Sequence, residues 1–387
     1  MTRREDDGPT APDSTTVADL EFVAVGWHHP HIHQIVAELL DAGAQLVGVA
    51  DEEADLALLA GELWGAPVLD VETILASNVD SPASGANLLV TADHPARRSA
   101  LAAEAMRNGF DVVIDKPAAI SNAQLAQLRT AQAETGRRCV VHCSERVSSR
   151  ATMAAIEMVA AGAIGTLVTV ECSAPHRVGD PTLRPDWFWQ PSSSGGIIAD
   201  IGAHQTDQFL ALVAADANQR GEPAPAASLE WASTSTLASL GGNAGSLGIE
   251  HPGFEHHGTF VLRAGAVTGV GRVDWWTPAG SPVWGDGRLT IVGTEATIEI
   301  RKHIDPAGRD GADHLILTDA AGITYRHHAG DQLEWPSALI NTGIGTGTDT
   351  AAASGDDLNR STLLFDQTRA FDAVDLALQA QRASDND

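Results

Sequence analysis

Short apolar runs alternate with helical segments between residue 19 and about residue 143. Apolar runs without polar alternation predict strands that are buried on both faces, and the segments between them show the period of helices. The pattern therefore predicts a doubly wound α/β domain with a parallel sheet over residues 19–143. The predicted strands are 22–26, 45–51, 87–92, 111–115 and 138–143, with a weak one near Val68, and the predicted helices are 31–43, 53–65, 71–77, 96–109 and 121–136.

The rhythm changes after residue 144. Beyond Leu229 several runs alternate apolar and polar residues, which is typical of antiparallel strands with one buried face. The pattern predicts a second, α+β domain over residues 144–387 with a large, mostly antiparallel open sheet. Its other predicted elements are helices over 149–161, 196–214 and 360–383, a strand over 166–174, a Trp-bearing loop over 177–193 and glycine-rich mobile loops over 241–258 and 341–356.

The composition indicates which binding partners and which cellular compartment to expect. The formal net charge is −27 and the pI is about 4.7, so nucleic acid and anionic membranes are unfavourable partners. Residues 1–18 are polar and lack the apolar segment of a signal peptide, which predicts a disordered tail. The three cysteines, Cys139, Cys143 and Cys172, are too few for a disulfide framework and predict a cytoplasmic protein with buried thiols, with a metal or redox pair as the alternative.

The first strand ends in a departure from the dinucleotide-binding fingerprint. Gly26 stands where G-x-G-x-x-G begins, but His28 and His31 replace the second and third glycines, which let the backbone approach a pyrophosphate and the helix pack closely. Pro30 suits a first helical turn, whose free amides attract phosphate. We expect Gly26, His28 and His29 to contact a cofactor.

Two strand ends add cofactor candidates. Asp51 ends the second strand, 25 residues after Gly26, where a carboxylate accepts hydrogen bonds from ribose hydroxyls and repels a 2′-phosphate. This favours NAD over NADP; the alternative is that Asp51 caps the next helix. Thr91, near the end of the strand over 87–92, is a further predicted cofactor contact.

The four histidines at positions 28, 29, 31 and 33 have a second interpretation, because imidazoles bind transition metals. Their spacing falls on a strand-to-helix turn, with no carboxylate or cysteine close by in sequence. We therefore predict no metal site there.

Two short motifs carry candidate chemistry. Asp115-Lys116-Pro117 follows a predicted strand, and GGIIADIGAHQTDQ spans residues 195–208. Asp200 and His204 are spaced i, i+4, so a helix places them on one face, where a carboxylate can orient an imidazole and raise its basicity. A general base for alcohol oxidation needs that arrangement. The alternatives are a solvated surface lysine and a buried core histidine.

These residues resemble the Gfo/Idh/MocA family of oxidoreductases. The family carries E-K-P after a strand of its Rossmann domain and G-G-G-x-x-x-D-x-G-x-H-x-x-D at the start of a helix in its second domain. Here the motifs read Asp115-Lys116-Pro117 and Ser194-Gly195-Gly196, then Asp200, Gly202, His204 and Asp207. Their order and separation match, and the resemblance covers roughly residues 19–383.

The resemblance implies a dehydrogenase that moves a hydride between NAD and a hydroxyl-bearing carbon of a sugar, cyclitol or related polyol. Lys116 would steady the developing alkoxide beside the nicotinamide, and Asp115 and Lys116 are both expected to contact the cofactor. His204 would exchange the hydroxyl proton, and Asp200 would position the substrate or His204. Three departures leave a non-catalytic dinucleotide or sugar sensor open: Asp at 115 in place of Glu, Arg98 where the family often has His, and the degenerate glycine loop. A metal-dependent lyase or hydrolase is a third alternative.

Substrate contacts are expected from the end of the strand over 166–174 and the loop after it. Trp rings stack on the apolar faces of sugar and cyclitol rings, and Arg reaches hydroxyls or a carboxylate. The alternative is that the Trp residues only pack beneath the loop. The candidates are His176, Arg177, Arg184, Trp187 and Trp189, with Arg146 lining the same cleft and Asp200 and His204 touching the substrate.

The segment 272–278, RVDWWTP, would expose apolar area in a monomer. Members of the resembled family commonly bury this face of the sheet between subunits. We therefore expect a homodimer or homotetramer.

Overall fold

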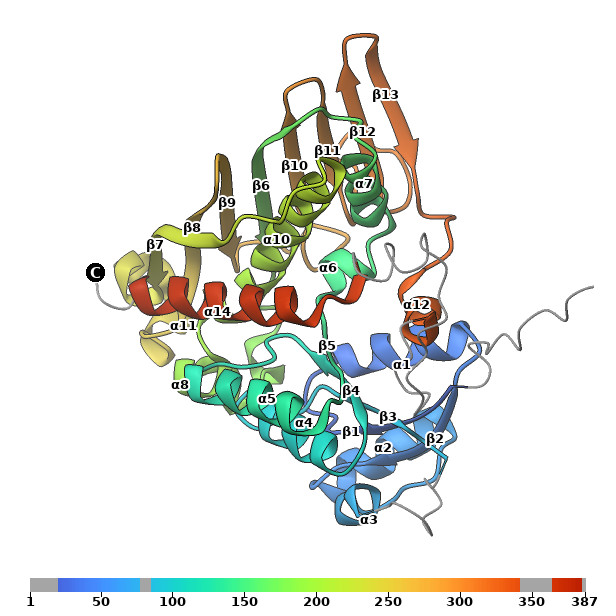
Figure 1. Cartoon of the computed structure of the whole chain (residues 1–387). Coiled ribbons are helices and arrows are strands. Elements are labelled where there is room, and N and C mark those ends of the chain that lie inside the picture. The colour runs from blue at the N-terminus through green and yellow to red at the C-terminus, as the bar shows by residue number, and fades with distance from the viewer. Residues whose placement is uncertain (1–19, 77–84, 342–363, 385–387) are drawn as a thin grey trace, which may run out of the picture.

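The computed structural model describes residues 20–76, 85–341 and 364–384, and within these ranges the chain forms two sheets with a long helix between them (Figure 1). The predicted tail over 1–18 and most of the predicted loop over 341–356 lie outside the described residues. None of the described helices is both long and apolar enough to span a bilayer.

The first sheet is parallel and has the strand order β2-β1-β3-β4-β5, which confirms the predicted doubly wound arrangement. Val68 contributes only a single bridge to Val49, so the weak strand predicted there does not extend further. The strands are β1 (Glu21–Val25), β2 (Gln45–Ala50), β3 (Leu88–Thr91), β4 (Asp111–Asp115) and β5 (Cys139–His142), and the helices are α1 (His31–Asp41), α2 (Ala54–Trp64), α3 (Val71–Leu75), α4 (Arg98–Arg107) and α5 (Asn122–Thr135).

The strand order reverses beside β1. The chain passes from β1 to β2 on one side and returns to β3 on the other side. Open α/β sheets bind ligands outside the carboxyl ends of the strands at such a switch point. The ends of β1, β3 and β4 are therefore the place to look for a site.

The second sheet has eight strands in the order β13-β12-β11-β10-β6-β9-β8-β7, and all neighbours are antiparallel except β6 and β9. This confirms the predicted large, mostly antiparallel sheet. Its strands are β6 (Leu167–Pro175), β7 (Ala227–Thr236), β8 (Glu255–Ala264), β9 (Val267–Asp274), β10 (Arg288–Gly293), β11 (Thr297–Arg301), β12 (His314–Asp319) and β13 (Gly322–His327).

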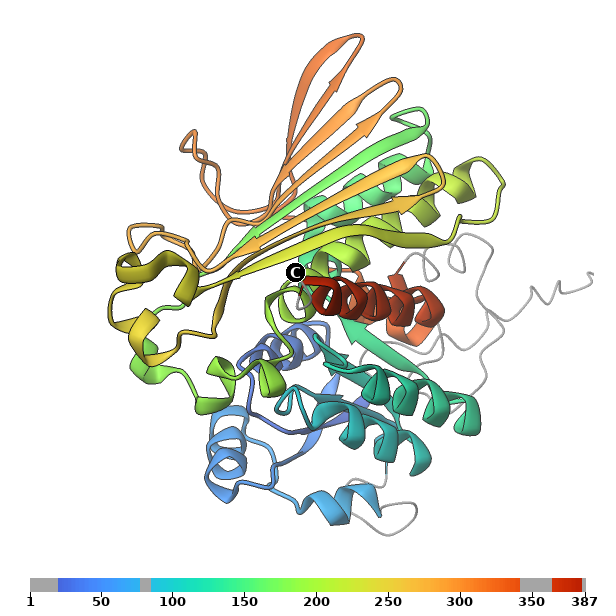
Figure 2. The same ribbon diagram turned by 90° about the vertical axis from the view of Figure 1, so that its left-hand side faces the viewer.

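The helices α7 (Arg150–Ala160) and α10 (Gly202–Gln219) cover one face of this sheet (Figure 2). In β6 the covered positions Val170, Cys172 and Ala174 are buried, whereas Glu171 between them is exposed. The segment 241–258, predicted as a mobile loop, instead contains helical turns and the start of β8. Gly241 and Gly245 adopt positive φ at these turns. The other elements are α6 (Ser144–Val147), η2 (Pro181–Leu183), η3 (Asp186–Trp189), α8 (Pro191–Ser194), α9 (Ile197–Asp200), η4 (Leu237–Ala244), α11 (Gly245–Glu250) and α12 (Trp335–Asn341).

The C-terminal helix α14 (Gln367–Ser384) packs between the two sheets (Figure 1). Phe371 and Leu378 join the core around α5 and β5, while Leu376 and Ala380 join the core beneath the second sheet. Burial on opposite sides stabilises a fixed arrangement of the two sheets, because both apolar stripes of α14 would otherwise be exposed. This arrangement brings the carboxyl end of β4 to α9 (Ile197–Asp200), where Lys116 meets Asp200.

The segment 272–278 exposes part of its aromatic surface. Trp276 is 52% exposed, whereas Trp275 is partly buried. The expected homodimer or homotetramer stays a prediction.

Candidate active site

The end of β4 is held by a buried arginine from α4. Arg98 donates from Nη1 to Asp115 Oδ2 at 3.1 Å and to the carbonyl oxygen of Lys116 at 2.5 Å, and its Nε donates to the carbonyl oxygen of Asp93 at 2.8 Å. Arg98 and Asp115 are fully buried, and the Lys116–Pro117 peptide bond is cis. Arg98 therefore fixes the backbone from which Lys116 extends. Sequence reasoning noted Arg98 only as a departure from a family position and missed this role.

Lys116 reaches across to the second domain. Its Nζ lies 2.8 Å from Asp200 Oδ1 at the end of α9, and the Lys116 side chain is 3% exposed. Gly195 and Gly196 precede α9 with φ of 96° and 85°, and a Cβ on Gly196 would overlap the side chain of Gln381 in α14. Glycine at this turn lets α14 and α9 meet, which brings Asp200 within reach of Lys116.

His204 lies on α10, one turn after Asp200, and is 1% exposed. The prediction that Asp200 orients this imidazole has no hydrogen bond to support it, because Asp200 is paired with Lys116 and His204 Nδ1 has no hydrogen-bond partner among the described residues. Burial lowers the pKa of His204 well below 6.5, and the positive charges of Lys116 and Lys302 lower it further. The ring is therefore neutral near pH 7 and able to accept a proton.

A buried ion pair supports the base of the site. Lys302 Nζ lies 2.9 Å from Glu145 Oε2 and 2.6 Å from Gln208 Oε1, and the Lys302 side chain is fully buried. Sequence reasoning missed this pair. The sequence did hold a signal. The apolar–polar alternation along 297–301 extends to Lys302 and places this lysine on the buried face of the sheet.

His176, at the end of β6, belongs to the same region. Burial lowers its pKa well below 6.5, and the charge of Lys116 contributes in the same direction. Its ring lies edge-on to Trp284, with the centroids 4.1 Å apart. The structure thus brings together Lys116, Asp200, His204 and His176 from both domains.

The loop over 177–193 crosses the carboxyl edge of the parallel sheet. The Trp187 ring centroid lies 5.2 Å from that of His94 and 6.2 Å from that of His29, both in loops of the first domain. Arg184 donates to the carbonyl oxygens of Val178 and Arg177 at 2.6 and 2.8 Å, so it holds the loop together.

Arg184 and Arg177 are both committed to backbone contacts. The Arg184 guanidinium lies 4.5 Å above the Phe188 ring, and burial lowers its pKa. Arg177 donates from Nη2 to the carbonyl oxygens of Ser281 and Val283, each at 2.8 Å. Trp189 stacks on His251 at 3.9 Å and 4°. The Trp187 ring therefore reaches the first domain, whereas Trp189 points into the second.

Arg146 does not line this cleft, which corrects the prediction. It is 2% exposed, and it binds Asp207 from Nε at 2.5 Å and from Nη2 at 3.0 Å. Its Nη1 donates to the carbonyl oxygen of Leu364. A buried arginine needs a paired carboxylate, and the last acidic residue of the second motif supplies it.

The turn after β1 has room for glycine alone at its first position. Gly26 has φ 81°, and a Cβ there would lie 2.5 Å from Asp93 Cβ. His28 Nδ1 lies 3.0 Å from Asp93 Oδ1, and His28 Nε2 lies 3.0 Å from Glu53 Oε1. The hydrogen bond to Asp93, with those of Glu53 and the charge of Asp51, raises the pKa of His28 to about 9. His28 is therefore a cation at neutral pH.

Asp51 lies beneath His28. Its Oδ2 accepts from the Trp27 amide at 2.6 Å, its Oδ1 accepts from the Glu53 amide at 2.8 Å, and its side chain is 1% exposed. Asp51 thus organises the loop before α2 without capping that helix, whose N-cap is Glu53 and has no side-chain cap hydrogen bond. Thr91 is fully buried and accepts from the Asp93 amide at 3.2 Å.

A cleft of about 290 Å³ lies at the switch point, between the ends of β1, β2 and β3. Its walls combine apolar side chains, suited to a flat base, with a carboxylate beside the first-turn glycine, suited to ribose. This composition fits the adenosine half of a dinucleotide. Its lining includes Gly26, Asp51, Val71, Leu75 and Arg97.

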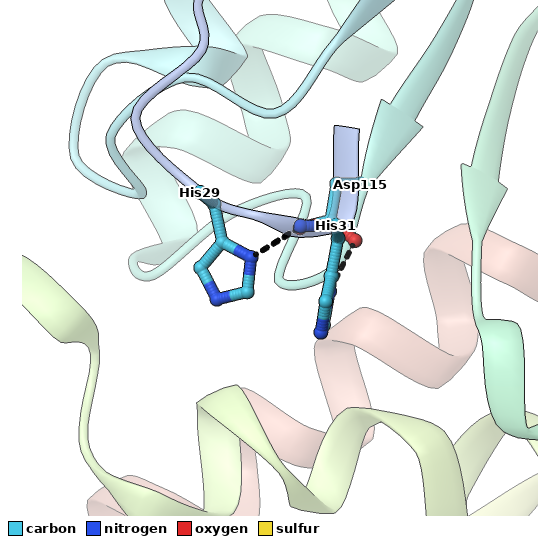
Figure 3. A group of neighbouring side chains, drawn as sticks. All are labelled: His29, His31 and Asp115. Atoms are coloured by element: carbon cyan, nitrogen blue, oxygen red, sulfur yellow. Dashed lines mark hydrogen bonds and ion pairs between the residues drawn. The ribbon is translucent and has the colours of Figure 1, made fainter. Parts of the chain in front are cut away.

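Two of the four loop histidines meet Asp115, as Figure 3 shows. His31 Nδ1 lies 3.0 Å from Asp115 Oδ1, and His29 Nδ1 lies 3.6 Å from Asp115 Oδ2. One atom from each residue could face a metal ion, since these atoms lie within 4.8 Å of one another. The sequence could not show this carboxylate, which is 84 positions from His31.

The charges around this cluster disfavour a cation. Arg98 is bonded to Asp115, and the charge of Lys116 lowers the pKa of His29 together with burial, the largest cause. His29 Nδ1 also accepts the His31 amide at 3.3 Å, so its lone pair is already used. His33 lies apart and accepts from Trp64 Nε1 at 3.2 Å. His29, His31 and Asp115 thus form a hydrogen-bonded group, and the prediction of no metal site there stays a prediction.

Comparison with known proteins gives three kinds of result. Residues 152–299 match the model of the GFO/IDH/MocA C-terminal domain. A solved structure of a candidate oxidoreductase from Erwinia carotovora atroseptica is 30% identical, with a TM-score of 0.77 over 94% of this chain and 98% of that chain. No curated protein matches the sequence.

Two more distant structures share the fold. An oxidoreductase from Agrobacterium radiobacter, solved with NAD+, L-tartaric acid and magnesium, is 16% identical, with a TM-score of 0.64 over 95% of this chain and 97% of that chain. The aldose-aldose oxidoreductase from Caulobacter crescentus, solved with glycerol, is 19% identical, with a TM-score of 0.65 over 95% and 98% of the two chains.

Proposed function

The chain belongs to the Gfo/Idh/MocA family of oxidoreductases, and from this premise we propose that it is an NAD-dependent dehydrogenase acting on a hydroxyl-bearing carbon of a sugar, cyclitol or related polyol. One observation carries the proposal. A buried Lys116 at the end of β4 is paired with Asp200, and the neutral imidazole of His204 lies on the same helical segment one turn away.

The cofactor is proposed to lie over the carboxyl ends of β1, β3 and β4, with its adenosine in the cleft beside Asp51. Asp51, Glu52 and Glu53 form an acidic run, which disfavours a 2′-phosphate and favours NAD over NADP. His28 and Arg97 would place positive charge near the pyrophosphate, where the missing glycines would otherwise bring backbone amides. His28 has to move away from Asp51 before ribose hydroxyls can reach that carboxylate.

The chemistry follows from the charges of the residues. A bound nicotinamide would accept the hydride in oxidation and return it in reduction. Lys116 donates a hydrogen bond to the reacting hydroxyl and stabilises the negative charge that grows on its oxygen. His204 takes the hydroxyl proton, because desolvation and two lysines keep its ring unprotonated. Asp200 keeps the Lys116 ammonium in place at 2.8 Å.

The proposed substrate lies between His176 and the loop that carries Trp187. A Trp face and a buried imidazole suit a small polyhydroxylated ring. The fold relative from Caulobacter crescentus acts on aldoses by its description, which supports the same substrate class here without identifying the sugar.

A second candidate is a non-catalytic sensor of dinucleotides or sugars. The observation that favours it is that Asp51 is 1% exposed and covered by His28. If His28 always stayed over Asp51, the protein would keep the catalytic residues but catalyse no reaction.

Calorimetric titration with NAD and NADP tests the proposal, using the wild type and Asp51→Ala. We expect NAD to bind more tightly than NADP and Asp51→Ala to weaken NAD at least tenfold, since both ribose hydroxyls lose their acceptor. Asp55→Ala removes the same charge from the first turn of α2, outside the cleft, and should bind NAD as the wild type does.

Turnover with a panel of polyols and aldoses then separates the dehydrogenase from the sensor. Reduction of NAD by any of them supports the dehydrogenase. Tight NAD binding without turnover supports the sensor. Absence of binding by either dinucleotide contradicts the dehydrogenase and leaves only a sensor of sugars.

A further inference from the structure

A second cavity lies beside the catalytic groups, at the end of the antiparallel sheet. Its volume is about 430 Å³, and its wall includes three Trp rings and one Phe ring beside aliphatic and polar residues. Aromatic walls with a few converging polar groups are typical of small-molecule sites. The residues that matter for its chemistry are Trp189, Phe254, Trp275, Trp276, His256 and Thr277.

The protonation of His256 is set by its neighbour. Trp276 Nε1 donates to His256 Nδ1 at 2.8 Å, so the Nδ1 lone pair is occupied and the ring proton is on Nε2. His256 is 7% exposed, and its Nε2 has no hydrogen-bond partner among the described residues. Burial also lowers its pKa, which keeps the ring neutral. His256, a residue of the cavity wall, therefore carries a buried N–H donor that is unpaired among the described residues.

Two other residues that line the cavity also carry a buried polar atom without a hydrogen-bond partner among the described residues. Thr277 Oγ1 and Arg177 Nε are buried and, among the described parts of the chain, have no partner. Arg177 is held in place because its Nη2 binds the carbonyl oxygens of Ser281 and Val283. Buried polar atoms without partners are uncommon in folded proteins and costly. Three around one cavity indicate a ligand that brings oxygen atoms to them.

The cavity adjoins the catalytic pocket. Phe254 and Trp275 line both this cavity and the smaller pocket that contains Asp200. One aromatic layer therefore separates the unpaired donors from the residue that holds Lys116. A ligand in the cavity and a substrate at Lys116 would be neighbours.

We propose that this cavity is a subsite for the second, non-reacting ring of a saccharide substrate, such as a disaccharide or glycoside. The aromatic walls stack on the C–H faces of a sugar ring, and the three polar groups bind its ring oxygen and hydroxyls. A lipid chain or a bare aromatic ring would leave all three donors unpaired. The identity of the reacting ring rests on the proposed function.

Titrations with cellobiose, maltose and lactose test the subsite, with glucose for comparison and without cofactor. Tryptophan fluorescence reports binding, because Trp189, Trp275 and Trp276 line the cavity, and calorimetry gives the affinity. We expect at least one disaccharide to bind at least tenfold more tightly than glucose.

Two substitutions localise the binding. His256→Phe keeps a ring but removes the Nε2 donor, and we expect it to weaken the disaccharide about tenfold. Thr277→Val keeps the shape, removes one hydroxyl and should weaken binding about threefold to tenfold. His257→Phe is the matched control, because the next residue of β8 points to the opposite face and lines a different pocket. It should bind as the wild type does.

The outcomes are separable from those of the proposed function. Failure of all three disaccharides to bind overturns the subsite, and so does binding that His256→Phe and Thr277→Val leave unchanged. Neither result affects NAD binding or the oxidation of monosaccharides. Conversely, disaccharide binding that both variants weaken supports the subsite even where NAD fails to bind, and in that case the dehydrogenase alone is contradicted.

Discussion

Two turns at the same edge of the parallel sheet differ in how they meet the family pattern. The turn after β4 keeps its charged motif as Asp115-Lys116-Pro117, with Lys116 buried and paired. The turn after β1 keeps Gly26 but has imidazoles at the next two glycine positions. The same sheet edge therefore carries one site that follows the pattern and one that departs from it.

The proposed function explains the difference by what each turn would have to provide in a dehydrogenase. The β4 turn must place one ammonium group opposite a reacting oxygen, and an error of 1 Å there costs catalysis. Arg98 meets that demand by binding the carbonyl oxygens of both Asp115 and Lys116. The β1 turn has to attract a diffuse negative charge, which backbone amides, a helix end or cationic side chains can each provide.

The largest effect is expected from the support of the β4 turn. Arg98→Met leaves the Asp115 carboxylate and two carbonyl oxygens without their buried donor. The free energy of unfolding should fall by about 3–5 kcal/mol, the usual loss when one partner of a buried pair is removed. Urea unfolding followed by circular dichroism measures it.

The neighbouring arginine provides the control for Arg98. Arg97 is 42% exposed in its side chain and pairs with Glu52 and Asp93, so Arg97→Met should cost less than about 1 kcal/mol. Equal losses for the two variants would contradict the role assigned to Arg98.

The next effect concerns Lys116 itself. Lys116→Met keeps the length of the side chain and removes the donor, so kcat for polyol oxidation should fall by about 10²–10³. NAD affinity should fall by much less than kcat, because the adenosine cleft lies at β1 and β2, away from Lys116. Steady-state kinetics with calorimetry separate the two. A normal kcat in this variant would remove Lys116 from the chemistry.

The smallest effect tests the β1 turn. The pKa of His28 is about 9 in the folded protein and near 6.5 in the unfolded chain. Since the folded value is raised, the stabilisation by His28 is fully present below about pH 6.5 and is lost as the pH rises through about 9. His28→Gln should lower the melting temperature at pH 6 and approach the wild type at pH 9.5. A constant difference across this range would show that His28 is neutral in the fold.

Local patterns were enough to predict much of the architecture. The continuous apolar run ending at Asp115 forms a fully buried strand, and alternation along 166–174 forms β6 with one covered face. Lys116 and His204 stood out because strand ends and helix starts are defined by neighbouring residues. The prediction for Arg146 was wrong, because a residue type does not say whether a side chain faces a cleft or the core. Thr91 is buried as well, and its predicted cofactor contact stays a prediction.

The sequence by itself determined the two kinds of sheet, the strand that ends just before Lys116 and the helix that carries His204, because these depend on spacing within a few residues. Only the tertiary structure decided which groups meet. Asp200 pairs with Lys116 rather than with His204, and Asp115 joins His29 and His31. The aromatic cavity likewise draws Trp189, Phe254 and Trp276 from separate segments. Such pairings depend on packing between the two domains and on the competition of charges for buried partners. The local periodicity of the sequence contains information on neither.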